Sequence, residues 1–164
     1  MEEIFFAKVK DSAIIPKKRE EDGCYDVYAN FEEQYLIIMP CEIKLIPTGI
    51  ASSCSSKYRF ALRERGSSGT KGLSYKAGQI DSGYRGEWFV PINNTSNKPI
   101  LITKCPEKYD KIIQKCVTIY PYSKAICQVA LEEVPKVLIK EIPYNDLLQI
   151  NSDRGTGALG SSNK

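Results

Sequence analysis

The chain has 164 residues, with 23 basic side chains, 20 acidic side chains and no histidine. This length suits one globular domain with its own hydrophobic core. The net charge of +3 comes without a dense block of lysine and arginine, so a nucleic-acid-binding stripe is not expected. Because histidine is absent, Ser-His-Asp and Cys-His catalysis and zinc sites with imidazole ligands are excluded. A general base near neutral pH must be a carboxylate, or a lysine or cysteine with a shifted pKa.

The cysteines and the apolar runs bear on the cellular compartment. None of the six cysteines is in a C-x-x-C pair, so we expect reduced, mostly buried thiols rather than a disulfide framework or a metal site. The first residues lack a basic segment followed by a long apolar one, and the longest apolar runs fall short of a membrane span. The expectation is a cytoplasmic protein that does not contact a membrane.

In chain order, short segments with the composition of β-strands alternate with Gly, Pro, Asn or Ser clusters. The predicted strands are Ile4–Lys10, Tyr25–Ala29, Tyr35–Met39, Glu42–Ile50, Tyr58–Leu62, Glu87–Asn93, Ile100–Thr103, Val117–Tyr120, Ala125–Leu131 and Val137–Ile142. Helical spacing occurs only at Glu107–Lys115 and in a short turn at Tyr144–Ile150. This pattern predicts an all-β protein, a jelly-roll-like sandwich or barrel with at most two short helices. We expect one β domain over residues 1–151 and a mobile C-terminal arm over residues 152–164.

Two polar segments in the first half of the chain suit an anionic ligand. Asp26 lies in the segment Asp22–Ala29, and an acid beside a triphosphate can hold a magnesium-bound water. Read alone, Asp26 is better explained as an ordinary strand-edge acid. The segment 64–72 follows a strand and combines glycines and hydroxyls with one Arg and one Lys, a composition typical of an anion-binding nest. The alternative is a polar hairpin loop.

The most informative segment is residues 78–94. Ile80 and Asp81 precede a tight Ser-Gly turn, and Tyr84 leads into an alternating apolar strand. This order predicts a hairpin with one carboxylate and one aromatic ring at its mouth.

Two further segments lie in the last third of the chain. Gln128, in the segment 121–129, can bond to a phosphate or can be a satisfied core amide. Residues 153–162 combine glycines, one Arg and two Ser hydroxyls, which is typical of an arm that wraps a polyphosphate or of a disordered tail.

In order, these five segments resemble the five signature motifs of the trimeric dUTPases, enzymes that split dUTP into dUMP and pyrophosphate. The third and fifth segments match best. The chain departs from the family pattern in four places. Cys24 stands where the family usually has Gly, and Gly66 falls between the Arg and the serines of the second motif. The fourth motif lacks its Gly-Asp turn and its Arg, and Leu159 replaces a Phe that stacks over uracil. Against the compact family pattern, residues 104–115 look like an insert, which could contact an unknown partner.

The resemblance implies a jelly-roll fold, a homotrimer with shared active sites, dUTP as substrate and Mg²⁺ as cofactor. It implies that Asp81 is the general base for attack of water on the α-phosphorus, that Asp26 holds Mg²⁺ through water, and that Tyr84 excludes a 2′-hydroxyl. Uracil would be read by the backbone within residues 74–81, and Arg154 and Ser161 would reach the phosphates from a neighbouring subunit. The implied substrate-binding residues are Arg65, Ser67, Ser68, Gly69, Gly78, Ile80, Tyr84, Gln128, Arg154, Leu159, Gly160 and Ser161.

Three other functions remain open. A dCTP deaminase shares the fold, but its catalytic Glu would fall at Pro91, which cannot act as an acid or base. A catalytically weak dUTPase-like module that binds a nucleotide or a protein is suggested by Leu159 and the altered fourth motif. A purely structural β-sandwich would leave Asp81, Tyr84 and the C-terminal segment unexplained.

Overall fold

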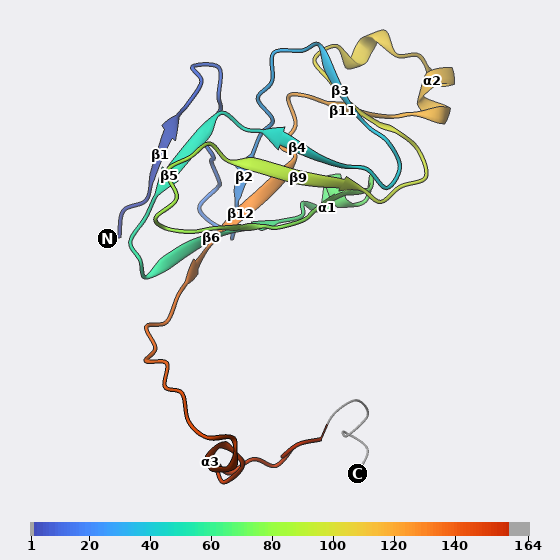
Figure 1. Ribbon diagram of the computed structural model, residues 1–164. Helices are drawn as coiled ribbons and strands as arrows, with labels where there is room; N and C mark the ends of the chain where they lie inside the picture. The colour runs from blue at the N-terminus through green and yellow to red at the C-terminus, as the bar shows by residue number, and fades with distance from the viewer. Residues whose placement is uncertain (1, 158–164) are drawn as a thin grey trace.

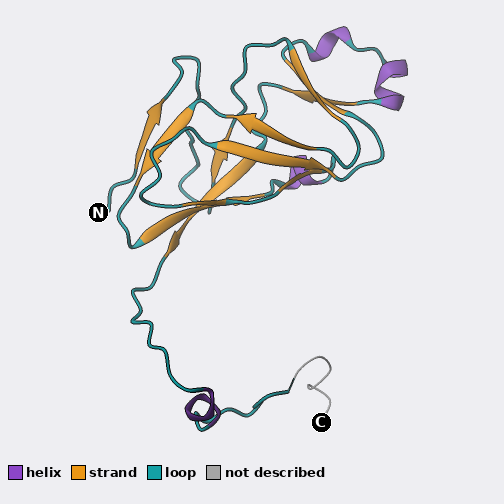
Figure 2. Cartoon of the chain, viewed as in Figure 1, coloured by secondary structure: helices purple, strands orange, loops and turns teal. Residues whose placement is uncertain are grey.

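The computed structural model describes residues 2–157, and strands dominate it (Figures 1 and 2). The strands are β1 (Phe5–Lys8), β2 (Tyr25–Val27), β3 (Tyr35–Ile38), β4 (Ile43–Pro47), β5 (Ile50–Ser53), β6 (Tyr58–Arg63), β7 (Leu73–Tyr75), β8 (Gln79–Ile80), β9 (Phe89–Asn94), β10 (Ile100–Thr103), β11 (Thr118–Pro121) and β12 (Cys127–Glu133). The helical elements are α1 (Gly66–Gly69), η1 (Pro106–Lys108), α2 (Lys111–Cys116) and α3 (Tyr144–Leu148). The predicted all-β class is confirmed, although α1 was not expected.

The strands form four small sheets, ordered β2-β12-β6-β8, β4-β9-β7, β11-β10-β3 and β1-β5. Their pairs are antiparallel except β10 with β11. In the four-stranded sheet, Gln128 of β12 lies opposite Asp26 of β2 on one side and Arg63 of β6 on the other. Since directly opposite residues share a face of a sheet, these three polar side chains form one cross-strand row.

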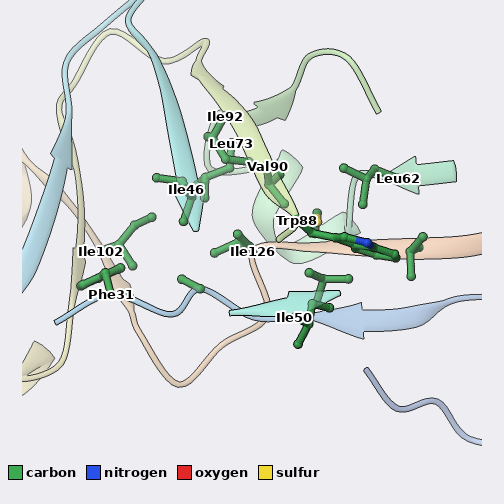
Figure 3. Packing of buried hydrophobic residues seen from close by; sticks show 14 of the residues in the cluster. Phe31, Ile46, Ile50, Leu62, Leu73, Trp88, Val90, Ile92, Ile102 and Ile126 are labelled. Carbon is green, nitrogen blue, oxygen red and sulfur yellow. The ribbon is translucent and has the colours of Figure 1, made fainter. Parts of the chain in front are cut away.

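The hydrophobic core holds the sheets together (Figure 3). In β9, Val90 and Ile92 are buried while Phe89 is exposed, as the two-residue period of a strand requires. Trp88 is fully buried, its ring centroid lies 5.2 Å from that of Phe60, and its indole N–H donates to the Ser52 hydroxyl at 3.2 Å. This packing gives the segments beside β8 and β9 a rigid support.

One predicted strand, Glu42–Ile50, is two strands in the structure. The chain turns between β4 and β5, where Gly49 has a φ of 67° and the Thr48 hydroxyl donates to the Trp88 carbonyl at 2.7 Å. A positive φ is readily adopted by glycine and ends a continuous strand. The strands β7 and β8 were not predicted, because they are too short to show alternation.

The predicted helix over Glu107–Lys115 is divided into η1 and α2. Tyr109 between them has an extended backbone, and Asp110 caps α2 by accepting from the backbone N–H groups of Ile112 and Ile113, both at 2.9 Å. The turn predicted at Tyr144–Ile150 is confirmed as α3. Among the residues the structure describes, no helix has the length and apolarity required to cross a membrane.

The predicted strand Val137–Ile142 is wrong, because residues 134–143 carry no secondary structure. After β12 the chain leaves the sheets and runs to α3, which lies apart from them (Figure 1). Val137, Leu138 and Ile139 are 76%, 81% and 89% exposed. A strand needs a hydrogen-bonded neighbour, and this segment meets none within the described part of its own chain.

Candidate functional site

Asp26 and Arg65 form the centre of a polar site at one end of the four-stranded sheet. Arg65 Nε lies 2.8 Å from Asp26 Oδ1, and Arg65 Nη2 donates to Asp26 Oδ2 at 3.2 Å. The two side chains therefore form a bidentate ion pair. Val27 and Cys127 point into the core, so the alternation of β2 and β12 turns Asp26 and Gln128 outward. The Gln128 amide also donates to the Glu64 carbonyl at 2.7 Å, which ties β12 to the segment that carries Arg65.

The segment 64–72 forms the short helix α1 rather than an open loop. Ser67 is exposed, and its hydroxyl accepts from Arg65 Nη1 at 3.1 Å. Ser68 is fully buried, and its hydroxyl donates to the Arg65 carbonyl at 3.2 Å. Of the two serines, Ser67 is therefore the one that a ligand can reach. Gly69 is exposed at the end of the same turn.

Two cavities meet at the Asp26–Arg65 pair. The larger, of about 530 Å³, is lined by Lys17, Lys18, Arg19, Asp22, Cys24, Asp26, Arg65 and Gln128. The smaller, of about 310 Å³, is lined by Asp26, Tyr28, Arg65, Ser67, Ser123, Lys124 and Ala125. Cations and hydroxyls of this kind suit a phosphate-bearing ligand. No role was predicted for Lys17, Arg19 or Lys124. Only the folded chain brings these residues into the cavities that Asp26 lines.

Asp81 and Tyr84 belong to a separate cavity of about 300 Å³. It is lined by Ala77, Gln79, Ile80, Asp81, Tyr84, Glu87, Phe89 and Pro91. Asp81 is exposed, and one of its carboxylate oxygens accepts from the Gln79 amide at 3.1 Å. The Tyr84 hydroxyl donates to the Glu87 carbonyl at 3.0 Å, which holds the 44%-exposed ring at the cavity wall. The cavity thus combines one carboxylate with an apolar and aromatic wall.

The hairpin predicted around Asp81 is wrong. β8 pairs with β6, whereas β9 pairs with β4 and β7, so residues 81–88 cross from one sheet to another. Arg85 secures this crossing by donating to the carbonyls of Ser82 and Ser52 at 2.6 and 3.3 Å. Glu87 secures it further by accepting from the Gly49 N–H at 2.8 Å.

Gly78 lies where the backbone passes close to an aromatic ring. A Cβ added there would lie 2.9 Å from Tyr75 Cδ2, with Tyr75 Cε2 closer still, and 3.2 Å from Leu62 Cβ. The Gly78 carbonyl also accepts from the Leu62 N–H at 2.6 Å. Only glycine fits this approach without displacement of the ring.

The two parts of the predicted site do not meet within the described part of one chain. Among residues 2–157, no side chain lines both the Asp81 cavity and a cavity at Asp26. Asp26 lies on β2 and Asp81 follows β8, the two edge strands of one sheet. With strands ~4.8 Å apart and an offset along them, the two carboxylates are on the order of 15–20 Å apart.

The C-terminal candidates are only partly described. Arg154 lies beyond α3 and lines none of the three cavities, and its Nε donates to the Gly157 carbonyl at 2.9 Å. Leu159, Gly160 and Ser161 lie outside the described residues.

The cysteines are less buried than expected. All six are free thiols, but only Cys127 is fully buried, and Cys41 and Cys116 are exposed. Burial raises the pKa of Cys127, and it raises the pKa of Cys54 despite the nearby Arg85 guanidinium. Both thiols therefore stay protonated at neutral pH and are poor nucleophiles.

The donor set at Asp26 fits a magnesium ion held mainly by a ligand. Within residues 2–157 no cluster of three or more Cys, Asp or Glu side chains could hold a metal ion by itself. Mg²⁺ keeps several waters and is often bound through one or two carboxylates together with substrate phosphates. Asp26 faces both cavities, but both of its carboxylate oxygens pair with Arg65, so it would hold such an ion through a bound water rather than directly.

The fold and these cavities define an all-β protein with a basic site for an anionic ligand and a separate carboxylate-bearing site. The dUTPase family model matches residues 10–123, which include Asp26, Arg65, Asp81 and Tyr84, and the chain belongs to this family. A deoxyuridine 5′-triphosphate nucleotidohydrolase of Clostridioides difficile is 32% identical over 164 residues, covering 94% of each chain. One of Finegoldia magna is 29% identical over 138 residues, covering 79% of this chain and 78% of the relative.

Solved structures agree with this assignment of the fold. The Staphylococcus bacteriophage 80alpha dUTPase with dUPNHPP superposes with a TM-score of 0.74 at 19% identity, and the match covers 99% of both chains. The dUTPase of the S. aureus phage phi11 gives a TM-score of 0.67 at 20% identity, covering 85% of this chain and 96% of that one. The jelly-roll type predicted from the sequence is thus the observed fold.

Proposed function

We propose that the protein hydrolyses dUTP to dUMP and pyrophosphate. The observation that carries this proposal is the placement of the family-matched residues. Arg65 and Ser67 line basic cavities suited to phosphates, while Asp81 and Tyr84 line a cavity with an apolar wall suited to a nucleoside.

Asp81 is the proposed general base. The Gln79 amide occupies one of its carboxylate oxygens and leaves the other free to accept a proton from water. The water oxygen bonds to the α-phosphorus, the bond from that phosphorus to the pyrophosphate oxygen breaks, and the water proton passes to Asp81. Arg65, Ser67 and Lys124 hold the phosphates in line, which is the main protein contribution to such transfers. A Mg²⁺ ion associated with Asp26 would neutralise charge on the phosphates.

Tyr84 is the proposed sugar-selecting residue. Its ring is fixed by the hydrogen bond to the Glu87 carbonyl and lies over Gly86, where an added Cβ would be 3.0 Å from Tyr84 Cε2. A ring held in this way leaves no room for a 2′-hydroxyl beside it. The backbone of residues 74–81 would read the uracil edge.

The site is proposed to be completed by other copies of the chain in a homotrimer. One α-phosphorus cannot be near both Arg65 and Asp81 of a single chain, because the two half-sites are too far apart. The apolar segment Val137–Ile139 extends from the domain and is suited to reach a neighbouring copy, carrying Arg154 with it. Burial of such side chains between copies is favourable.

The direct test is pyrophosphate release from dUTP compared with dCTP, dTTP and UTP, with and without Mg²⁺. We expect magnesium-dependent turnover of dUTP alone. Ammonia release from dCTP would instead identify a deaminase. Tight binding of dUTP without turnover would identify the nucleotide-binding module.

A further inference from the structure

The loop that precedes β2 forms one wall of the larger cavity. Lys17, Lys18 and Arg19 all line that cavity, together with Arg65 and Gln128. The Lys17 carbonyl accepts from the Asp26 N–H at 2.9 Å, and the two residues form an isolated antiparallel bridge. The loop is therefore attached to the outer edge of β2 at the position of Asp26.

This bridge places Lys17 in the cross-strand row described above. Because residues directly opposite each other point to the same face, Lys17 lies beside Asp26, as Gln128 does on the other side. The row across the sheet is then Lys17, Asp26, Gln128 and Arg63. Lys17 extends this polar row by one strand position.

The three cations of this loop differ in their partners. The Lys18 ammonium donates to the carbonyls of Asp22, Glu20 and Arg19 at 2.8, 3.2 and 3.3 Å, so it holds the loop in shape. Within residues 2–157, the side chains of Lys17 and Arg19 take part in no hydrogen bond or ion pair, although the Arg19 backbone N–H donates to the Asp22 carboxylate at 3.2 Å. Their charges are available to a ligand in the cavity.

The charge balance favours a polyanion there. Four cationic side chains and two acidic ones line the larger cavity, and Arg65 is already paired with Asp26. Lys17 and Arg19 would add two positive charges to those of Arg65 and Lys124 beside a triphosphate. In the proposed shared site, the α-phosphate must stay open to the water beside Asp81 of a neighbouring copy. The phosphates beyond it are therefore those that can enter this cavity.

We propose that Lys17 and Arg19 bind the two phosphates that leave as pyrophosphate. This inference rests on the proposed dUTPase function and assigns to the loop the preference for a triphosphate over a monophosphate.

The test uses the full chain and inorganic pyrophosphate as the probe. Lys17→Gln and Arg19→Gln should each weaken pyrophosphate binding, measured by calorimetry, by about tenfold, as expected for loss of one charged hydrogen-bonding partner at an exposed site. Binding of dUMP should be unchanged. For dUTP hydrolysis, KM should rise while kcat changes little.

Lys57→Gln is the matched control, because Lys57 pairs with Glu2 at the other end of β6. This substitution should leave pyrophosphate binding, dUMP binding, KM and kcat unchanged. Unchanged pyrophosphate affinity at low salt in a variant that combines Lys17→Gln with Arg19→Gln would overturn the inference. Equal losses for dUMP and pyrophosphate would also overturn it. Failure of the wild-type protein to hydrolyse dUTP would refute the proposed function instead, and the pyrophosphate titration would still decide the role of the loop.

Discussion

Replacement of Val137, Leu138 and Ile139 by serine should weaken assembly without unfolding the β domain. These side chains are 76–89% exposed, in a segment whose backbone runs away from the sheets (Figure 1). Burying a Val, Leu or Ile side chain contributes about 1.5–3 kcal/mol. Three of them at this exposure could contribute about 4–7 kcal/mol in the oligomer. Since alternate residues of an extended segment face opposite sides, about half of that is a realistic gain.

The expected loss is therefore about 2–4 kcal/mol, or roughly 30- to 1,000-fold in the dissociation constant. Sedimentation velocity over a dilution series measures this constant, and thermal unfolding at low protein concentration measures the fold of the free chain. Ile112→Ser is the control, because Ile112 is 73% exposed on α2, away from this segment. If the triple variant assembles as tightly as the wild type, or if its β domain unfolds, the reasoning is wrong.

Three further substitutions test the site itself. The Asp81→Asn variant should bind dUTP normally, and its turnover should fall by roughly 10²–10⁴-fold, the usual contribution of a positioned general base. Asp11 is also an exposed acid, so the Asp11→Asn variant should remain active. Near-normal activity of the Asp81 variant would refute the role of Asp81. Tyr84→Ala should raise UTP hydrolysis relative to dUTP, because the ring that blocks the 2′-hydroxyl is gone; an unchanged ratio in competition assays would argue against steric selection. Gly78→Ala should lower the free energy of unfolding by about 1–3 kcal/mol in urea, because the added methyl overlaps a neighbouring ring. Gly23→Ala should lower the free energy of unfolding by less, because a Cβ added at Gly23 meets nothing within 4 Å. An equal loss of stability in the two variants would contradict the packing argument.

Local pattern was sufficient for the fold class and for much of the strand layout. The alternation of buried and exposed residues in β9 is visible in the sequence because the period of a strand is local. The order of the polar segments was sufficient to suggest the family. The absence of histidine restricted the general base to a carboxylate, or to a lysine or cysteine with a shifted pKa. These properties depend on residue type and spacing alone.

Other features depended on contacts between residues far apart in the chain. The turn at Gly49 is completed by a hydrogen bond to the Trp88 carbonyl, and the two-residue β8 exists only because β6 pairs with it. The segment 137–142 has strand composition but no strand neighbour among residues 2–157 of its own chain. Strand propensity cannot supply a hydrogen-bonding partner, so the local prediction failed there.

The arrangement of the site was decided by tertiary structure in the same way. The register of β12 brings Gln128 beside Asp26, the bridge at Lys17 adds a cation to that row, and Arg65 closes the ion pair. The topology also places Asp81 on the opposite edge of the sheet, in a different cavity. The sequence determined which side chains were available for the chemistry. Their neighbours were set by long-range strand pairing, because a register is fixed by packing of the whole core rather than by the few residues around each motif.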